Sequence, residues 1–214
     1  MRPARDRFRH LPAALLFVAG SMLPPRLAAP STVAEQRARL PPPAKCTDPI
    51  AGVWKSHDYR TDRRMWTEFT IEIRRVADDE TALAGTITNH TWDGTEADVQ
   101  PGPCGIDQLR TVISMDAQGR VEGDDLSFGG VGKWRLDRQV CGDFDYGYNL
   151  DHFTGVVDHQ IEEFQSVNND GGVSVNEPTV FRRVRCFDSP VATANPVARP
   201  PFQPPRASGC GCGG

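Results

Sequence analysis

The sequence lacks long apolar runs and the short motifs of the common enzyme classes. Its longest apolar-rich stretch, Leu11–Leu23, has about 13 residues, whereas a helix that spans a bilayer needs about 20. There is no Gly-x-Ser-x-Gly, no His-Glu-x-x-His, no phosphate-binding loop and no dinucleotide-binding fingerprint. The sequence therefore predicts no integral membrane segment and favours a protein without catalytic activity.

The N-terminus has the organisation of an export signal. Four arginines among the first nine residues precede the apolar run, and small residues follow it as far as Ala34. A basic start, a short apolar stretch and small residues are typical of a secretory signal peptide. Residues 1–34 are interpreted in this way, with cleavage after Ala34 or after Ala29, and the mature protein is expected to be secreted or periplasmic.

Positive charge is scarce in the predicted mature chain. Removing residues 1–34 takes away five of the 24 basic residues and one of the 28 acidic ones, which leaves a net charge of −8. A field of this sign repels the phosphates of nucleic acids and anionic membrane surfaces. We expect a soluble protein that does not bind nucleic acid.

Composition divides the rest of the chain into three zones. Residues 35–45 end in three consecutive prolines and read as a Pro-rich linker. Residues 46–187 carry regular apolar patterning and have the size of a single domain. Residues 188–214 are Pro-rich without any periodicity and are expected to form a disordered tail, which ends in Gly-Cys-Gly-Cys-Gly-Gly.

The apolar pattern within 46–187 has a period of two. Phe69, Ile71 and Ile73 alternate with polar residues, as in a strand with one buried face. No window of about a dozen residues has a helical period. The predicted strands are 50–57, 66–75, 82–92, 108–115, 119–128, 132–140, 151–158, 162–168 and 177–186. The turn signals between strands lie at 76–80, 116–119, 129–130 and 168–172.

Eight or nine short strands at hairpin spacing indicate an all-β fold. An antiparallel meander of about eight strands that closes into a barrel removes the exposed sheet edges. A β-sandwich is the alternative.

Four cysteines lie within the domain, and their positions suggest a pairing. Cys46 precedes the first strand and Cys186 ends the last, which are neighbours in a closed meander. Cys104 and Cys141 flank the three strands predicted between 108 and 140. In an oxidising compartment we therefore expect the disulfides Cys46–Cys186 and Cys104–Cys141.

The triplet Gly52-Val53-Trp54 at the first strand resembles the Gly-x-Trp signature of the lipocalins and their barrel relatives. The resemblance implies a lipocalin-like barrel with Trp54 plugging its closed end. It further implies that Arg182 or Arg183 packs on this Trp, and that the ligand is a small apolar molecule. The chain departs from the lipocalins after the last strand, where the Pro-rich tail replaces their C-terminal helix.

Two other groups of residues are candidates for ligand binding. Asn168 and Asn169 stand beside a Gly-Gly turn, where side-chain amides can bind sugar hydroxyls but also serve the turn itself. Tryptophans can stack on a sugar ring or simply fill the core. The full candidate set is Trp54, Trp66, Trp92, Trp134, Arg182, Asn168 and Asn169.

Metal binding is a further hypothesis at two places. Asp143, Asp145 and Asp151 supply carboxylates that could bind calcium, or that could simply cap turns. Cys210 and Cys212 could hold a soft ion such as Cu(I), or serve attachment, chain pairing or modification of the tail. No other cofactor is expected.

Taken together, these features favour an exported, non-enzymatic binding protein for a small apolar ligand or a glycan. One alternative is a structural or surface-attached spacer that functions through its Cys-x-Cys tail. The third is a hydrolase that uses acidic residues.

Overall fold

The structure is a computed structural model that describes residues 31–106, 108–144, 147–172 and 175–187. Most of the predicted signal peptide lies outside these ranges, as does the predicted tail 188–214 with Cys210 and Cys212. Asp145, one of the candidate calcium ligands, also lies outside the described residues.

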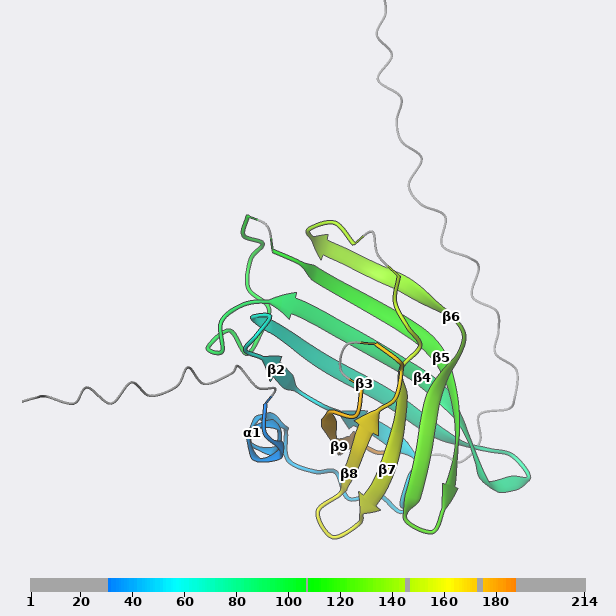
Figure 1. The fold of residues 1–214 in the computed structure, drawn as a ribbon. Coiled ribbons are helices and arrows are strands. Elements are labelled where there is room, and N and C mark those ends of the chain that lie inside the picture. Colours follow the sequence, from blue (N-terminus) through cyan, green and yellow to red (C-terminus); the bar gives the residue numbers. More distant parts are fainter. Residues whose placement is uncertain (1–30, 107, 145–146, 173–174, 188–214) are drawn as a thin grey trace, which may run out of the picture.

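The described residues form one helix and nine antiparallel strands, and eight of these strands close into a barrel (Figure 1). β1 pairs with β3 on one side and with β9 on the other, which closes the ring. The predicted all-β barrel is confirmed. The elements are α1 (Val33–Arg39), β1 (Gly52–Lys55), β2 (Asp58–Arg60), β3 (Met65–Val76), β4 (Asp79–Asp93), β5 (Arg110–Glu122), β6 (Asp125–Cys141), β7 (His152–Asp158), β8 (Glu163–Asn168) and β9 (Pro178–Arg185).

One predicted strand, 119–128, is instead a hairpin, and two predicted turns, 116–119 and 129–130, lie within strands. The chain reverses at Gly123, which has a left-handed φ of 63°, as tight hairpin turns require. The glycines that suggested turns have another role. A Cβ at Gly119 would lie 2.1 Å from the Ser127 carbonyl oxygen, and one at Gly129 would lie 2.0 Å from His152 Nδ1. These glycines therefore allow close strand approach.

β6 continues beyond the barrel as the outer strand of the sheet (Figure 1). Only residues 125–129 pair with β7, and residues 131–141 pair with β5 alone in the described part of the chain. The register between β5 and β6 shifts at three places along this stretch. Bulges of this kind twist an edge strand and hinder its pairing with another chain.

The closed half of the barrel is filled by apolar side chains, among which four phenylalanines form a chain of ring contacts. Phe153 packs edge-on against Phe69 and Phe181, at centroid distances of 5.0 and 4.8 Å. Phe164 stacks on Phe181 at 5.8 Å. These rings come from β3, β7, β8 and β9, so the core ties the first half of the barrel to the second.

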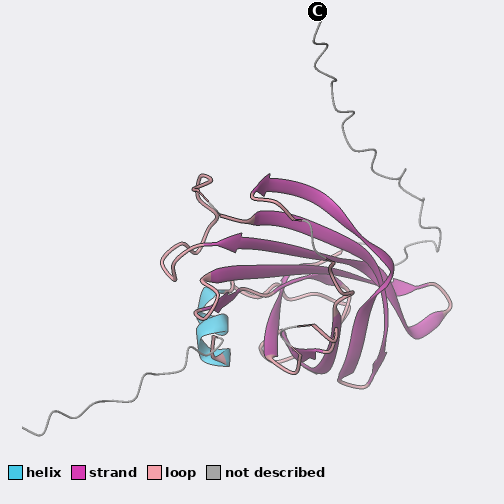
Figure 2. Cartoon of the chain, turned by 45° about the horizontal axis from the view of Figure 1, so that its top comes forward, coloured by secondary structure: helices cyan, strands magenta, loops and turns pink. Residues whose placement is uncertain are grey.

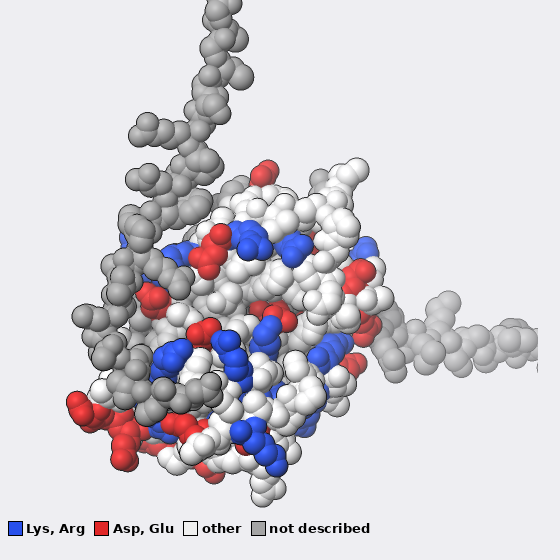
Figure 3. All heavy atoms as spheres, turned by 180° about the vertical axis from the view of Figure 1, so that it is seen from behind, with Lys and Arg blue, Asp and Glu red and all other residues white. Residues whose placement is uncertain are grey.

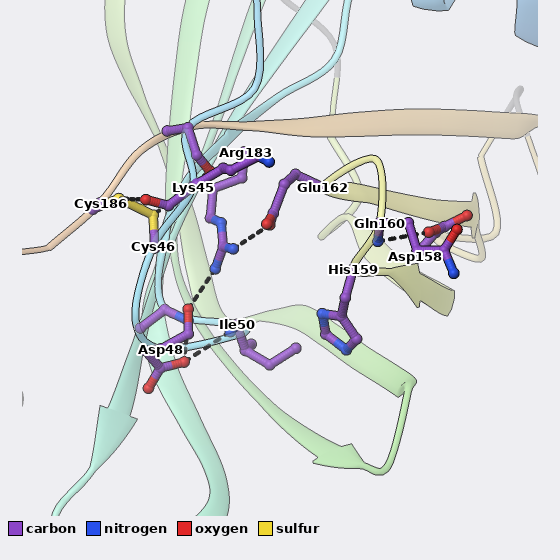
Figure 4. Close-up of polar contacts among 12 residues, drawn as sticks. Lys45, Cys46, Asp48, Ile50, Asp158, His159, Gln160, Glu162, Arg183 and Cys186 are labelled. Carbon is purple, nitrogen blue, oxygen red and sulfur yellow. Dashed lines mark hydrogen bonds and ion pairs between the residues drawn. A yellow bond between two sulfur atoms is a disulfide. The ribbon is translucent and has the colours of Figure 1, made fainter.

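Trp54 and Arg183 lie at the closed end of the barrel, and Figure 4 shows Arg183 between Glu162 and Asp48. Trp54 is fully buried, and its indole N–H donates to the Ile50 carbonyl over 2.9 Å. Arg183, directly opposite on β9, lies over the Trp54 ring at 5.2 Å. Its guanidinium also donates to the Asp48 carbonyl over 2.6 Å and pairs with Glu162.

The lipocalin resemblance left two arginines open as partners of Trp54, and the structure selects Arg183. Arg182, the neighbouring residue on β9, instead binds Glu163 over 2.6 Å and the Leu40 carbonyl. Successive residues of a strand face opposite sides, so only one of the pair can reach Trp54.

Both expected cysteine pairings are present. Cys46 and Cys186 join the chain before β1 to the chain after β9, with their Cα atoms 5.4 Å apart. Cys104 and Cys141 lie 5.7 Å apart and connect the segment before β5 to the end of β6.

The helix α1 begins within the last residues of the predicted signal peptide and continues into the stretch interpreted as a linker, and it lies against the barrel (Figure 2). Thr32 and Glu35 form a capping box at its start. The Gln36 side chain donates to the Pro178 carbonyl over 2.8 Å and accepts from the Val180 amide over 2.9 Å. β1 does not reach residues 178–180 of β9. The Gln36 side chain therefore makes the hydrogen bonds there that a neighbouring strand would otherwise make. A seven-residue helix depends on such tertiary contacts, which periodicity does not reveal.

We expect Arg183→Lys to lower the free energy of unfolding by about 2–4 kcal/mol. Arg183 is 1% exposed, and a lysine cannot donate to both Glu162 and the Asp48 carbonyl while lying over Trp54. Urea unfolding of the full mature chain measures the loss. The matched control is Arg185→Lys on the same strand, because Arg185 is 66% exposed and lies 3.9 Å from Glu72. This control should change stability by less than about 0.5 kcal/mol. Equal losses in the two variants would contradict the assignment.

Candidate functional site

A cavity of about 310 Å³ lies inside the barrel at the end opposite Trp54. We call it the mouth cavity. Its walls come from the strands β2 to β5, from the segment before β7, and from the residues that connect β8 to β9.

The mouth cavity exists because the inward-facing positions of three strands change character along their length. Deep in the barrel these positions are apolar, and towards the mouth they become polar. The change runs from Phe69 to Thr67 on β3, from Ile87 to Asn89 and Thr91 on β4, and from Ile113 to Thr111 on β5. Apolar residues of this size fill the closed half, whereas the shorter polar ones leave the open half hollow.

A chain of hydrogen bonds runs along the wall of the mouth cavity. The Asn89 amide donates to the Tyr148 hydroxyl over 2.6 Å, and this hydroxyl donates to Asp151 Oδ2 over 2.8 Å. The Asn168 amide donates to Asp151 Oδ1 over 2.9 Å. Asn168 is fixed in turn by the His152 backbone N–H, which donates to its Oδ1 over 3.0 Å. The network therefore joins β4, β7 and β8 around one carboxyl group.

Asp151 is 1% exposed, and its burial raises the pKa of this carboxyl to about 7. The hydrogen bonds from Asn168 and Tyr148 oppose the rise, whereas the negative charge of Asp170 adds to it. The pKa of Tyr148 is raised well above its usual value of 10, first by burial and then by the Asp151 charge. At neutral pH the Tyr148 hydroxyl therefore stays protonated, whereas the Asp151 carboxyl is present in both its protonated and its ionised form.

On the opposite wall, β2 and the start of β9 contribute charged groups. Arg60 pairs with Glu177 across the gap between these strands and with Asp62 over 3.1 Å. Burial raises the pKa of Asp58. One carboxyl oxygen of Asp58, Oδ1, has no hydrogen-bond donor within the described part of the chain.

Chemically, this arrangement can hold hydrogen-bonding groups of a ligand, and its Asp151 carboxyl can take up or release a proton near neutral pH. The described residues that line the cavity include no histidine, cysteine or serine. They therefore provide neither the nucleophile nor the imidazole base of a Ser or Cys hydrolase.

The structure places one of the two candidate asparagines in the cavity wall. Asn168 binds Asp151 there, whereas Asn169 is exposed and donates to the Thr154 hydroxyl over 3.0 Å. Trp54 and Arg182 belong to the closed half and do not line the cavity.

Two of the candidate tryptophans lie on the outer face of the barrel. Trp66 and Trp92 are direct partners on β3 and β4, and their rings stack at 6.0 Å. Their indole N–H groups donate to the Thr95 and Asp98 carbonyls, so residues 94–98 cover them. This outer cluster does not reach the mouth cavity.

Trp134 lies behind the wall of the cavity. Its ring packs edge-on against Phe144 at 5.8 Å and against Tyr148 at 6.3 Å, and both of these residues line the cavity. Trp134 therefore supports Tyr148 and supplies no stacking surface in the lining itself.

The candidate metal ligands are not brought together among the residues that can be placed. Asp143 is exposed, whereas Asp151 is buried in the hydrogen-bond network. The part of the chain that the structure describes contains no group of three or more His, Cys, Asp or Glu side chains that could hold a metal ion. Because Asp145, Cys210 and Cys212 lie outside it, the calcium and copper hypotheses remain predictions.

Sequence reasoning missed Asn89, Tyr148 and Asp58 as site residues. Asn89 could have been found, because it follows the apolar Leu83 and Ile87 at the inward positions of its strand. A polar residue at such a position has a buried partner or a ligand. Tyr148 and Asp58 had no comparable signal, because one lies in an irregular segment and the other in a three-residue strand.

The outer surface gives no support for a nucleic-acid partner on the face seen in Figure 3. Lysine and arginine side chains alternate there with aspartate and glutamate, without an extended basic area. Within the described ranges, no helix combines the length and the apolar character needed to cross a membrane.

No protein-family model, no curated protein and no solved structure matches the chain. The geometry of the mouth cavity is therefore the basis for the proposed function.

We expect Asp151→Asn to stabilise the protein at pH 8 by about 2–4 kcal/mol. A carboxyl whose pKa is about 7 when folded and about 4 when unfolded keeps its proton in the folded state between these values. Stability therefore falls as pH rises from 4 to 7, and the whole cost is present at pH 8. Urea unfolding at pH 4.5 and pH 8 measures the effect, which should be small at the lower pH.

The control for this series is Asp125→Asn, at an exposed position on the hairpin of the closed end. It should shift stability equally at both pH values. An Asp151→Asn protein that is less stable than wild type at pH 8 would mean that the network stabilises the ionised carboxylate.

Proposed function

We propose that this chain is an exported binding protein whose mouth cavity holds a small, hydroxyl-rich molecule such as a sugar. The observation that carries the proposal is the cavity itself: a hollow of about 310 Å³ in a closed barrel, with an apolar floor and a polar wall. Ligand sites of proteins are concave, largely pre-formed, and combine apolar contact with a few well-placed polar groups.

The walls are suited to recognition because their polar groups are held in fixed positions. Asn89, Asn168 and Tyr148 hold one another through hydrogen bonds of 2.6–2.9 Å around Asp151. Donors and acceptors that are already ordered lose little conformational freedom when a ligand binds. The apolar floor of Phe69 and Ile113 can contact the C–H face of a sugar ring.

Most of the surface that lines the mouth cavity is apolar, but threonines, asparagines and charged residues lie near its opening. These hydrogen-bonding groups favour a hydroxyl-rich ligand over a purely apolar one, because buried polar groups need partners. Trp66 and Trp92, the stacking candidates, face the outside of the barrel.

The described lining has no serine, cysteine or histidine and so offers no Ser- or Cys-type nucleophile with an imidazole base, whereas its carboxyl groups leave the acidic hydrolase as an alternative. Export is supported by the Cys46–Cys186 and Cys104–Cys141 pairs, because disulfides persist in oxidising compartments.

The test fills the cavity. In Thr67→Phe an aromatic ring replaces a threonine of the lining, and in the control Thr70→Phe the same change lies on the outer face of β3. Saturation-transfer NMR and calorimetry with a panel of monosaccharides should detect binding to wild type. We expect the affinity to fall at least about tenfold in Thr67→Phe and to change less than twofold in Thr70→Phe.

Native mass spectrometry of protein purified from its host complements this test, because it can retain a bound ligand and report its mass. If no panel sugar binds and no ligand is retained, the binding proposal is wrong, and the spacer alternative takes its place. If both variants bind as well as wild type does, the ligand lies outside the mouth cavity.

A further inference from the structure

We propose that the ligand of the mouth cavity carries a positively charged ammonium group, with Asp151 as its counter-ion. The inference rests on the proposed binding function and specifies the chemical class of the ligand: a small hydroxylated amine. The balance of charges in the cavity favours a cation.

Asp151 is a buried carboxyl group whose hydrogen-bond donors are both neutral. The donors are the Asn168 amide and the Tyr148 hydroxyl, and the charge of Asp170, which also acts on this carboxyl group, is negative. A buried carboxylate is costly unless a cation is close. An ammonium group in the cavity would supply that cation and form a charge-assisted hydrogen bond.

The charged groups of the lining are negative on balance. The described lining has four carboxyl groups, on Asp58, Asp151, Asp170 and Glu177, against two guanidinium groups, on Arg60 and Arg63. Arg60 is engaged by Glu177 and Asp62. The Asp58 oxygen that lacks a donor in the described chain is a second acceptor. An anion would therefore be repelled, whereas a cation would be attracted.

The cavity also presents aromatic faces suited to an organic cation. Phe69, Phe144 and Tyr148 all line it, and aromatic rings attract ammonium groups through their quadrupole. A bare metal ion would need six or more oxygen ligands if it were calcium. Among the described residues no group of three or more metal-binding side chains is present. The chemistry of the lining thus fits an ammonium group better than a metal ion.

The experiment uses three probes with the same hydroxylated six-carbon chain and different charge: 1-amino-1-deoxysorbitol, sorbitol and gluconate. Calorimetry on the full mature chain at pH 8 compares their dissociation constants. We expect the amine to bind at least about tenfold more tightly than sorbitol, since hydrogen bonds between charged groups contribute the most. Gluconate should bind most weakly.

Substitutions test whether Asp151 is responsible for the preference for the amine over sorbitol. In Asp151→Asn the advantage of the amine over sorbitol should fall to within about twofold. Asp170→Asn should reduce the advantage by a smaller factor, and it leaves the network around Tyr148 in place. Asp125→Asn at the opposite end of the barrel is the control and should keep the full advantage. The thermal transition of each variant checks that it is folded.

The pH dependence provides an independent readout. The groups that face Asp151 are Tyr148, Asn168 and Asp170, and the charged groups across the cavity are Asp58, Arg60, Arg63 and Glu177. Of these, Asp151 has its pKa at about 7, and an alkylammonium group stays charged far above this pH. The advantage of the amine should therefore shrink at pH 5.5, and in Asp151→Asn it should not change with pH.

Four other results would overturn the ammonium inference. Equal affinity for the amine and sorbitol would overturn the ammonium inference and leave the binding function intact. Tightest binding of gluconate would also overturn it. Binding of calcium alone that requires Asp151 would replace the ammonium with a metal ion. If no probe and no sugar binds, the inference and the proposed function both fail.

Discussion

The contact between Arg183 and Trp54 holds the barrel closed, and the rest of the structure depends on it. The two residues are opposite each other on β9 and β1, the last and first strands of the ring. Because Arg183 also binds Glu162 and the Asp48 carbonyl, it joins the hairpin between β7 and β8 to the segment that precedes β1. The register decides which residues of a strand point into the barrel, because a shift of one residue would exchange its inward-facing and outward-facing side chains.

The division of the barrel into a filled half and a hollow half follows from that register. Inward positions near Trp54 carry large apolar groups, which repay the entropy of ordering the strands. Near the mouth they carry Thr67, Asn89 and Thr111, which contribute less to stability. A buried carboxyl such as Asp151 is tolerated in this half because the closed half and two disulfides stabilise the fold without it. Functional sites commonly have this kind of local cost.

Sequence reasoning reached the closed barrel and the cysteine pairs, because period-two patterning and the position of Cys46 and Cys186 depend on regular geometry. It placed β6 wrongly, since Gly129 and Gly130 look like turn residues until their close strand contacts are known. It overlooked α1, because Gln36 acts through contacts with a strand more than 140 residues away.

The candidate site was harder to predict than the fold. Asn168 was identified from turn chemistry, but its partner Asp151 was considered only as a calcium ligand. The tryptophans were expected at a ligand because of their size, and strand parity instead puts Trp66 and Trp92 outside. Parity is set by pairing across the sheet, and the sequence of one strand does not state which face will be covered.

The closed end also determines how the molecule can be oriented. Cys186 is bonded to Cys46 there, and the Phe187 ring lies 3.6 Å from the Arg74 guanidinium on the outside of β3. Residue 187, where the described chain ends, therefore lies at the end opposite the mouth cavity. If the molecule were anchored to a surface through this end, the cavity would open away from the surface, towards the solution. Such a molecule would be an outward-facing receptor on a tether, with the ligand arriving from the free side.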